Sequence, residues 1–211
     1  PCKLLESEGR TFPVEISYQP GEPDEPLWLK VRAALRGVLS QDSQTERDSG
    51  DVLVFLPGAA EIRRCQDELA ELAQQRDLDV LPLHGDLPFD EQRRAVAPRS
   101  RTGAAAKRRK IILATNVAET SLTIDGVTVV IDSGLARVAG HNPWSGLPTL
   151  RLQPICRAQA TQRAGRAGRT APGRCLRLYS RVDHDNRPEF EVPEIRRIYL
   201  LHRFHRGGLG R

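Results

Sequence analysis

The chain has 211 residues, of which 39% are hydrophobic and 28% are charged, and its formal net charge is +5. These proportions are typical of a globular chain with one large domain, or one domain and part of a second, and they exclude a disordered chain. No apolar run approaches the roughly 18–20 residues of a membrane-spanning helix, so we expect no membrane contact. The basic balance favours a polyanionic partner without proving one.

The sequence contains no methionine. Because translation begins with methionine, we expect a trimmed product or, preferably, a piece of a longer protein; the first residues do not resemble a signal peptide. The cysteines form no C-x-x-C motif and have no His at ligand spacing, so we expect neither a metal site nor a disulfide framework. We instead expect the cysteines to be buried free thiols in a reducing compartment, which predicts a cytoplasmic protein. These cysteines are Cys2, Cys65, Cys156 and Cys175.

Strands and helices are expected to alternate in the first two thirds of the chain. Apolar runs predict strands at residues 12–18, 51–56, 80–83, 111–114 and 127–131. Apolar residues at helical spacing predict helices at residues 24–39, 59–76 and 88–97. The polar segments between them, 40–50 and 115–126, are expected to be loops. This alternation predicts an α/β fold around a parallel sheet.

The pattern changes after residue 134. Two strands, at 135–141 and 147–155, flank a segment rich in the turn formers Pro and Gly, which predicts a hairpin that projects from the sheet. A helix is expected at 158–168 and a strand at 175–179, and the residues after 180 are expected to be loop-like.

The segment that reads QATQRAGRAGRTAP is the most informative. On a helix, Gln162, Arg166 and Arg169 would share one face, where two forked guanidiniums and an amide suit a phosphate group. A solvated basic helix is the alternative. Gly165 and Gly168 count against it, because each glycine costs a helix about 1 kcal/mol relative to alanine. Close approach of another backbone or a ligand would explain both glycines.

This segment resembles motif VI of superfamily 2 helicases, in which arginines reach the γ-phosphate of ATP across a domain interface. Other segments resemble the DEAH-box branch in the correct order: motif IV at residues 52–62, motif V at 114–126 and the segment after motif V at 130–134. Further details are similar to the bacterial HrpB-type helicases, at residues 8–14, 83–98 and 133–137. The resemblance covers residues 4–200.

The resemblance implies a RecA-like parallel sheet flanked by helices, with a protruding antiparallel β-hairpin at 135–157. Residues 1–182 would form the second RecA-like (helicase C-terminal) domain, and residues 183–211 would begin the next region, a winged-helix entry. The sequence contains neither a Walker A loop nor a DExH box, which hold ATP with Mg²⁺. The resemblance places both in a missing first RecA-like domain, so we expect this chain to be inactive alone.

The resemblance also implies roles for single residues. Arg166 and Arg169 would be arginine fingers for ATP hydrolysis, and Gln162 would place the attacking water or the γ-phosphate. Three further residues are expected near the nucleotide: Asp125, Gly126 and Arg163.

Short polar side chains after the fourth strand are expected to contact the phosphates and 2′-hydroxyls of RNA: Thr115, Asn116, Thr120 and Ser121. Capping of turns and helix starts is the alternative for these side chains. The hairpin resembles the strand-separating wedge of the family, and Trp144 at its tip could stack on a base or pack against protein.

Two other interpretations stay open. The chain could be a non-catalytic nucleic-acid-binding module, or part of a translocase of the same superfamily that acts on DNA. The sequence does not decide between RNA and DNA. Val96 stands near the position where eukaryotic relatives carry an adenine-stacking aromatic residue, so adenine selectivity also stays open.

Overall fold

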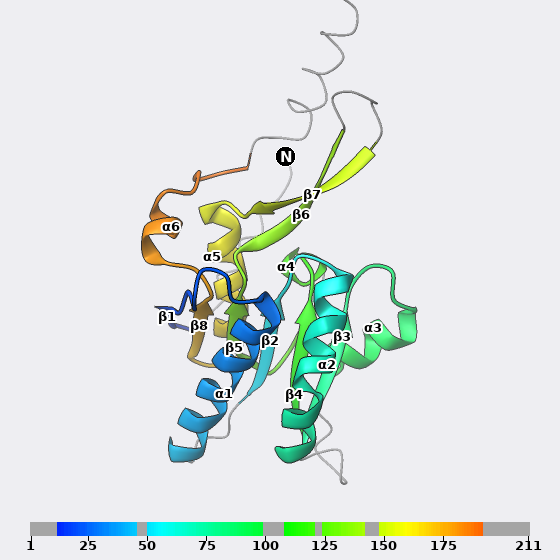
Figure 1. Cartoon of the computed structure of the whole chain (residues 1–211). Coiled ribbons are helices and arrows are strands. Elements are labelled where there is room, and N and C mark those ends of the chain that lie inside the picture. Colours follow the sequence, from blue (N-terminus) through cyan, green and yellow to red (C-terminus); the bar gives the residue numbers. More distant parts are fainter. Residues whose placement is uncertain (1–11, 46–49, 99–107, 121–123, 142–147, 192–211) are drawn as a thin grey trace, which may run out of the picture.

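A computed structural model describes residues 12–45, 50–98, 108–120, 124–141 and 148–191 (Figure 1). Six strands form a parallel sheet in the order β1-β8-β5-β2-β4-β3. The strands are β1 (Val14–Tyr18), β2 (Asp51–Phe55), β3 (Leu78–Leu83), β4 (Arg109–Ala114), β5 (Val127–Asp132) and β8 (Gly173–Arg177). The predicted α/β fold with a parallel sheet is therefore confirmed.

Helices cover both faces of this sheet (Figure 1). One face carries α1 (Leu27–Thr45) and α2 (Ala59–Gln75). The other face carries α3 (Phe89–Val96), α4 (Val117–Thr120), α5 (Arg157–Gly165) and the 3₁₀ turn η2 (Arg166–Gly168). One more helix, α6 (Arg181–Asp185), follows β8.

The central strand β2 shows why the sequence adopts this arrangement. All five of its residues are buried. Val52 and Val54 pack into the core beneath α1 and α2, whereas Leu53 and Phe55 pack into the core on the other face. Because successive side chains of a strand point to opposite faces, a continuous apolar run needs cover on both sides, and the helices supply it.

Three segments that the sequence predicted as loops contain helix. Residues 40–45 continue α1, α4 lies within 115–126, and α6 follows residue 180. The first extension lacks apolar periodicity, but Asp42 on it pairs with Arg109 of β4 at 2.6 Å and with Arg174 of β8. Tertiary ion pairs therefore favour helix where the local pattern predicted loop.

The strands β6 (Leu135–His141) and β7 (Pro148–Pro154) form the predicted antiparallel hairpin, which extends beyond the sheet (Figure 1). Trp144 and Ser121 lie outside the described residues, as does the side chain of Thr120. The expected boundary at residue 182 falls inside α6, and the division into two regions stays a prediction. Among the described residues, no helix is long and apolar enough to cross a bilayer.

Candidate nucleotide and nucleic-acid sites

Three of the predicted nucleotide residues lie at the edge of the sheet opposite to the described nucleic-acid candidates. Asp125 and Gly126 directly precede β5, and Arg169 lies shortly before β8, the neighbour of β5. Thr115 and Asn116 follow β4 at the carboxyl edge. Because all six strands are parallel, the first group shares the amino edge, and α5 and η2 run from one edge toward the other.

The turn before β5 requires its glycine. Gly126 has φ +83°, a conformation that side chains other than glycine rarely adopt. Its carbonyl oxygen accepts a hydrogen bond from the Asp51 N–H at 2.7 Å, which joins the starts of β2 and β5. Asp125 and Gly126 are both exposed, so this turn is open to a ligand.

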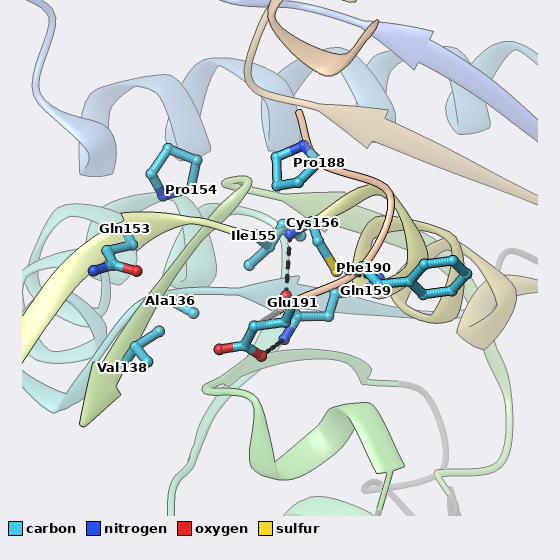
Figure 2. Close-up of a pocket in the computed structure, with 10 residues that line it drawn as sticks. All are labelled: Ala136, Val138, Gln153, Pro154, Ile155, Cys156, Gln159, Pro188, Phe190 and Glu191. Atoms are coloured by element: carbon cyan, nitrogen blue, oxygen red, sulfur yellow. Dashed lines mark hydrogen bonds between the residues drawn. The ribbon is translucent and has the colours of Figure 1, made fainter. Parts of the chain in front are cut away.

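The start of α5 is fixed by a capping box. Gln159 N–H donates to Sγ of Cys156 at 3.5 Å, and Cys156 N–H donates to Oε1 of Gln159 at 3.1 Å. The same Gln159 amide donates from Nε2 to Glu191 at 3.3 Å (Figure 2). This reciprocal pair satisfies amide groups that a helix start leaves free, and it sets the direction of α5.

The helix ends earlier than predicted, and the exposure of the side chains around its end is uneven. After Gly165 the chain tightens into η2, so Arg166 is only 3% exposed, whereas Gln162 and Arg169 are exposed. The predicted helix is therefore not continuous, and Arg166 is buried between two exposed residues, where a 3₁₀ turn has fewer residues per turn than an α-helix.

The Arg166 guanidinium is held by the loop that contains the predicted RNA contacts. Its Nε donates to the carbonyl oxygen of Glu119 at 3.1 Å, and Nη2 donates to the same oxygen. Burial, with a smaller contribution from nearby Arg169, lowers the pKa of Arg166. Motif VI and motif V are therefore joined by a direct contact.

The two glycines of η2 and α5 have different surroundings. A Cβ on Gly168 would lie 2.5 Å from the carbonyl oxygen of Phe12, and Phe12 N–H donates to Gly168 at 2.8 Å. The predicted close approach of a backbone is confirmed there. A Cβ on Gly165 would meet no described atom within 4 Å, so the described residues give no steric reason for this glycine.

Arg163 occupies the interior instead of the surface. Its side chain is 0% exposed, its Nε donates to Glu119 at 3.1 Å and its Nη1 donates to Asp132 at 2.9 Å. Burial alone would lower the pKa of Arg163, but the two carboxylates outweigh that effect and raise it. A nucleotide contact would require the guanidinium to leave both carboxylates, so the geometry favours a positioning role.

Sequence reasoning missed Glu119 and Asp132 as members of this network. Burial raises the pKa of Glu119, against the opposing effect of Arg163. Asp132 also accepts hydrogen bonds from Gly134 N–H at 2.9 Å and from the Tyr179 hydroxyl at 3.5 Å. A carboxylate at the end of an apolar strand was the available signal, because a buried charge needs a partner.

At the carboxyl edge, the side chains of the described RNA candidates form no hydrogen bond with the described part of the chain. Thr115 N–H donates to the carbonyl of Leu83 at 3.1 Å, which fixes the start of the loop. Neither the Thr115 hydroxyl nor the Asn116 amide hydrogen-bonds to a described residue, so capping does not occupy them. Within the described ranges, no three His, Cys, Asp or Glu side chains gather as a metal site.

Comparisons with known proteins agree with this geometry. The family described as helicase conserved C-terminal domain matches residues 30–171. The ATP-dependent RNA helicase HrpA of Escherichia coli is 41% identical over 199 residues, which cover 93% of this chain and 14% of HrpA. The human probable ATP-dependent RNA helicase DHX35 is 41% identical over 207 residues, which cover 94% of this chain and 28% of that protein.

A crystal structure of the E. coli DExH-box NTPase HrpB has 40% sequence identity to the chain and a TM-score of 0.78, over 90% of this chain and 22% of that structure. The chain therefore spans 14% to 28% of the length of these relatives. These matches confirm the resemblance to DEAH-box and HrpB-type helicases. The chain belongs to the family of helicase conserved C-terminal domains.

Proposed function

We propose that the chain is the second RecA-like domain of an ATP-dependent RNA helicase, and that it supplies arginine fingers and part of the nucleic-acid track. The printed names of HrpA and DHX35, both ATP-dependent RNA helicases, support this function. The observation that carries it is the contact between Arg166 and the Glu119 carbonyl. This contact connects the residues suited to phosphate with the loop suited to RNA.

The nucleotide half of the proposal rests on exposed donors. Arg169 and Gln162 are exposed, and the Asp125–Gly126 turn is open at the amino edge. ATP with Mg²⁺, when bound by a first RecA-like domain, supplies the phosphoanhydride bond that is cleaved. Arg166 and Arg169 then stabilise the charge that develops on the γ-phosphate, an effect worth about 10³–10⁵ in rate for an arginine finger.

The nucleic-acid half rests on the loop after β4. Thr115 and Asn116 present a hydroxyl and an amide that no described residue binds, and such groups bind backbone phosphates and 2′-hydroxyls. Thr120 and Ser121 extend the same track in this proposal, and Trp144 stacks on a base at the hairpin tip.

The Arg166–Glu119 contact gives a route between the two halves. When Arg166 reaches for the γ-phosphate, it leaves the carbonyl of Glu119 at the end of α4, and the loop that begins at Thr115 loses one of its supports. Hydrolysis removes the anion and lets the contact form again. The state of the nucleotide thereby changes the RNA-binding loop, as in other switches that a phosphate holds.

The test is kinetic and uses the full-length helicase. Arg166→Ala and Arg169→Ala are each expected to lower ATP turnover by about 10³ while the affinity for a fluorescent ATP analogue is kept. Arg157→Ala, at the exposed start of α5, is the matched control and keeps both. Near-normal turnover in both finger variants contradicts the proposal. Comparing RNA with DNA as the stimulating strand separates an RNA helicase from a DNA translocase.

A further inference from the structure

The hairpin is held at its base by contacts with the interior of the domain. Ile155 N–H donates to the carbonyl of Gly134 at 3.0 Å, and Arg187 donates to the same carbonyl at 2.9 Å. Arg163 donates to the carbonyl of Leu135 at 3.2 Å. These bonds fix the first residue of β6 and the residue after β7.

The two faces of the hairpin contact different elements. Ala136 packs with Ile155 against Ala160 of α5. The next residue of β6, Arg137, points to the opposite face, as alternation along a strand requires. There its Nη2 donates to Oε1 of Glu61 in the first turn of α2 at 3.0 Å. The hairpin therefore packs against α5 with one face and forms an ion pair with the start of α2 on the other face.

Gly58 leaves space for the side chain of Arg137 next to α2. It is the N-cap residue of α2, it is buried, and a Cβ there would lie 2.7 Å from Nε and 3.0 Å from Cδ of Arg137. Its φ of −169° is ordinary extended backbone, so the turn does not need a glycine, but a Cβ there would displace the flexible end of Arg137. Arg137 therefore contacts the segment that resembles motif IV, to which Gly58 and Glu61 both belong.

The part of β7 that lies across from Arg137 and beyond it is exposed to solvent. Leu150 and Leu152 of β7 are 64% and 52% exposed. The register pairs Arg137 with Leu152 and Ala139 with Leu150, so Arg137 is the last charged side chain of the described hairpin that reaches the body of the domain. This ion pair therefore lies between the base of the hairpin and its exposed outer part.

We propose that Arg137, Glu61 and Gly58 form a hairpin latch that sets the orientation of β6–β7 relative to the sheet. Arg137 and Glu61 act in this proposal as positioning residues, through their contact with each other. The consequence for strand separation rests on the proposed helicase function, whereas the orientation of the hairpin does not. Because a partly exposed ion pair shifts an equilibrium by only about two- to fivefold, the latch affects hairpin direction and not the stability of the domain.

The first test measures hairpin orientation in the full chain. Spin labels at Leu150→Cys and Gln74→Cys report the distance between the hairpin and the exposed side of α2. Cys65 and Cys175 are buried with thiol pKa values raised to about 12, and Cys156 is also buried, so these cysteines stay unlabelled. Cys2→Ser removes the cysteine that lies outside the described residues.

A narrow distance distribution is expected for the parent chain, and a broader or shifted one for Arg137→Gln and for Gly58→Ala. The glycine variant displaces Arg137 without changing any charge. Arg151→Gln on β7 is the matched control, because Arg151 is exposed and forms no ion pair with a described residue. The exchange Arg137→Glu with Glu61→Arg is expected to restore the narrow distribution. Unchanged distributions in both single variants, with circular dichroism that shows a folded domain, overturn the latch.

The second test measures coupling in the full-length helicase. Arg137→Gln is expected to lower duplex separation by about two- to fivefold while RNA-stimulated ATP hydrolysis stays within about twofold. An equal fall in both activities shows a general defect and overturns the positioning role. If the unmodified helicase separates no duplex, the proposed function fails, and the distance measurement still decides whether the latch exists.

Discussion

Nη1 of Arg163 donates to Oδ1 of Asp132 at 2.9 Å, and neither side chain is exposed to solvent. The same guanidinium lies 4.8 Å above the centroid of the Phe55 ring and pairs with Glu119. This network joins the end of β5, the end of β2, α4 and α5. Its residues therefore connect every segment that carries a helicase motif in this chain.

Removal of Arg163 is expected to destabilise the domain strongly. Arg163→Met leaves Asp132 and Glu119 buried without their cation, and breaking a buried pair in this way costs about 3–5 kcal/mol. Urea unfolding followed by circular dichroism measures the free energy of unfolding. Arg169→Ala, which changes an exposed arginine six residues later, is the control and stays within about 0.5 kcal/mol. A loss below about 1 kcal/mol in Arg163→Met would refute the structural role.

Two glycines are expected to respond in opposite ways to alanine. Gly134 has φ +70°, and a Cβ there would collide with the ring of Tyr179. Gly134→Ala should cost at least about 2 kcal/mol of unfolding free energy, from backbone strain and overlap together. Gly37 lies exposed in α1 with no atom within 4 Å of a new Cβ, so Gly37→Ala should add about 0.5–1 kcal/mol. Equal effects at both positions would contradict the local geometry.

The sequence predicted the layers of the fold because its apolar runs are long and buried on both faces. The run at residues 51–56 is an example, since only a central parallel strand buries all of β2. It did not predict the direction of Arg166. A helical pattern of 3.6 residues per turn was extended through Gly165, and the switch to a 3₁₀ turn depends on the fit of Gly168 against Phe12, which is a tertiary contact.

In the candidate site, too, the local sequence pattern does not predict contacts between residues that are distant in the sequence. The resemblance to motif V pointed to Asp125, Gly126, Thr115 and Asn116, and the structure leaves them exposed or half-buried next to strand ends. Arg163 was expected near the nucleotide, because the sequence around it does not show whether its side chain points to the surface or to the interior. Its partners lie 44 and 31 residues away, so only the assembled sheet brings them together.

The buried thiols predict a loss of stability at alkaline pH. Burial raises the pKa of Cys65 and Cys175 from the ordinary thiol value of 9.0 to about 12. Between pH 9 and 12 the unfolded chain releases these protons and the folded chain keeps them, so stability falls as pH rises, by about 1.4 kcal/mol per pH unit for each thiol. Below pH 9 both states are protonated and the thiols have no such effect.

Urea unfolding at pH 8, 9 and 10 measures this slope. Cys175→Ala is expected to make the slope shallower, whatever its effect on the absolute stability at pH 8. Labelling with iodoacetamide at pH 8 supplies a second measurement, in which Cys65 and Cys175 react only after urea is added. Rapid labelling of either thiol in the folded chain would show that burial does not protect it.

Gly165 is expected to matter for catalysis and not for folding. It lies exposed at the end of α5 with helical angles, and a Cβ there meets no described atom within 4 Å. Gly165→Ala should therefore leave the unfolding free energy unchanged or raise it by up to about 1 kcal/mol. If a nucleotide or another domain approaches this surface during hydrolysis, the added methyl group obstructs it, and ATP turnover in the full-length helicase falls. Gly37→Ala makes the same chemical change on a helix remote from the site and should keep full turnover. Normal turnover in Gly165→Ala would show that no close partner covers this end of α5.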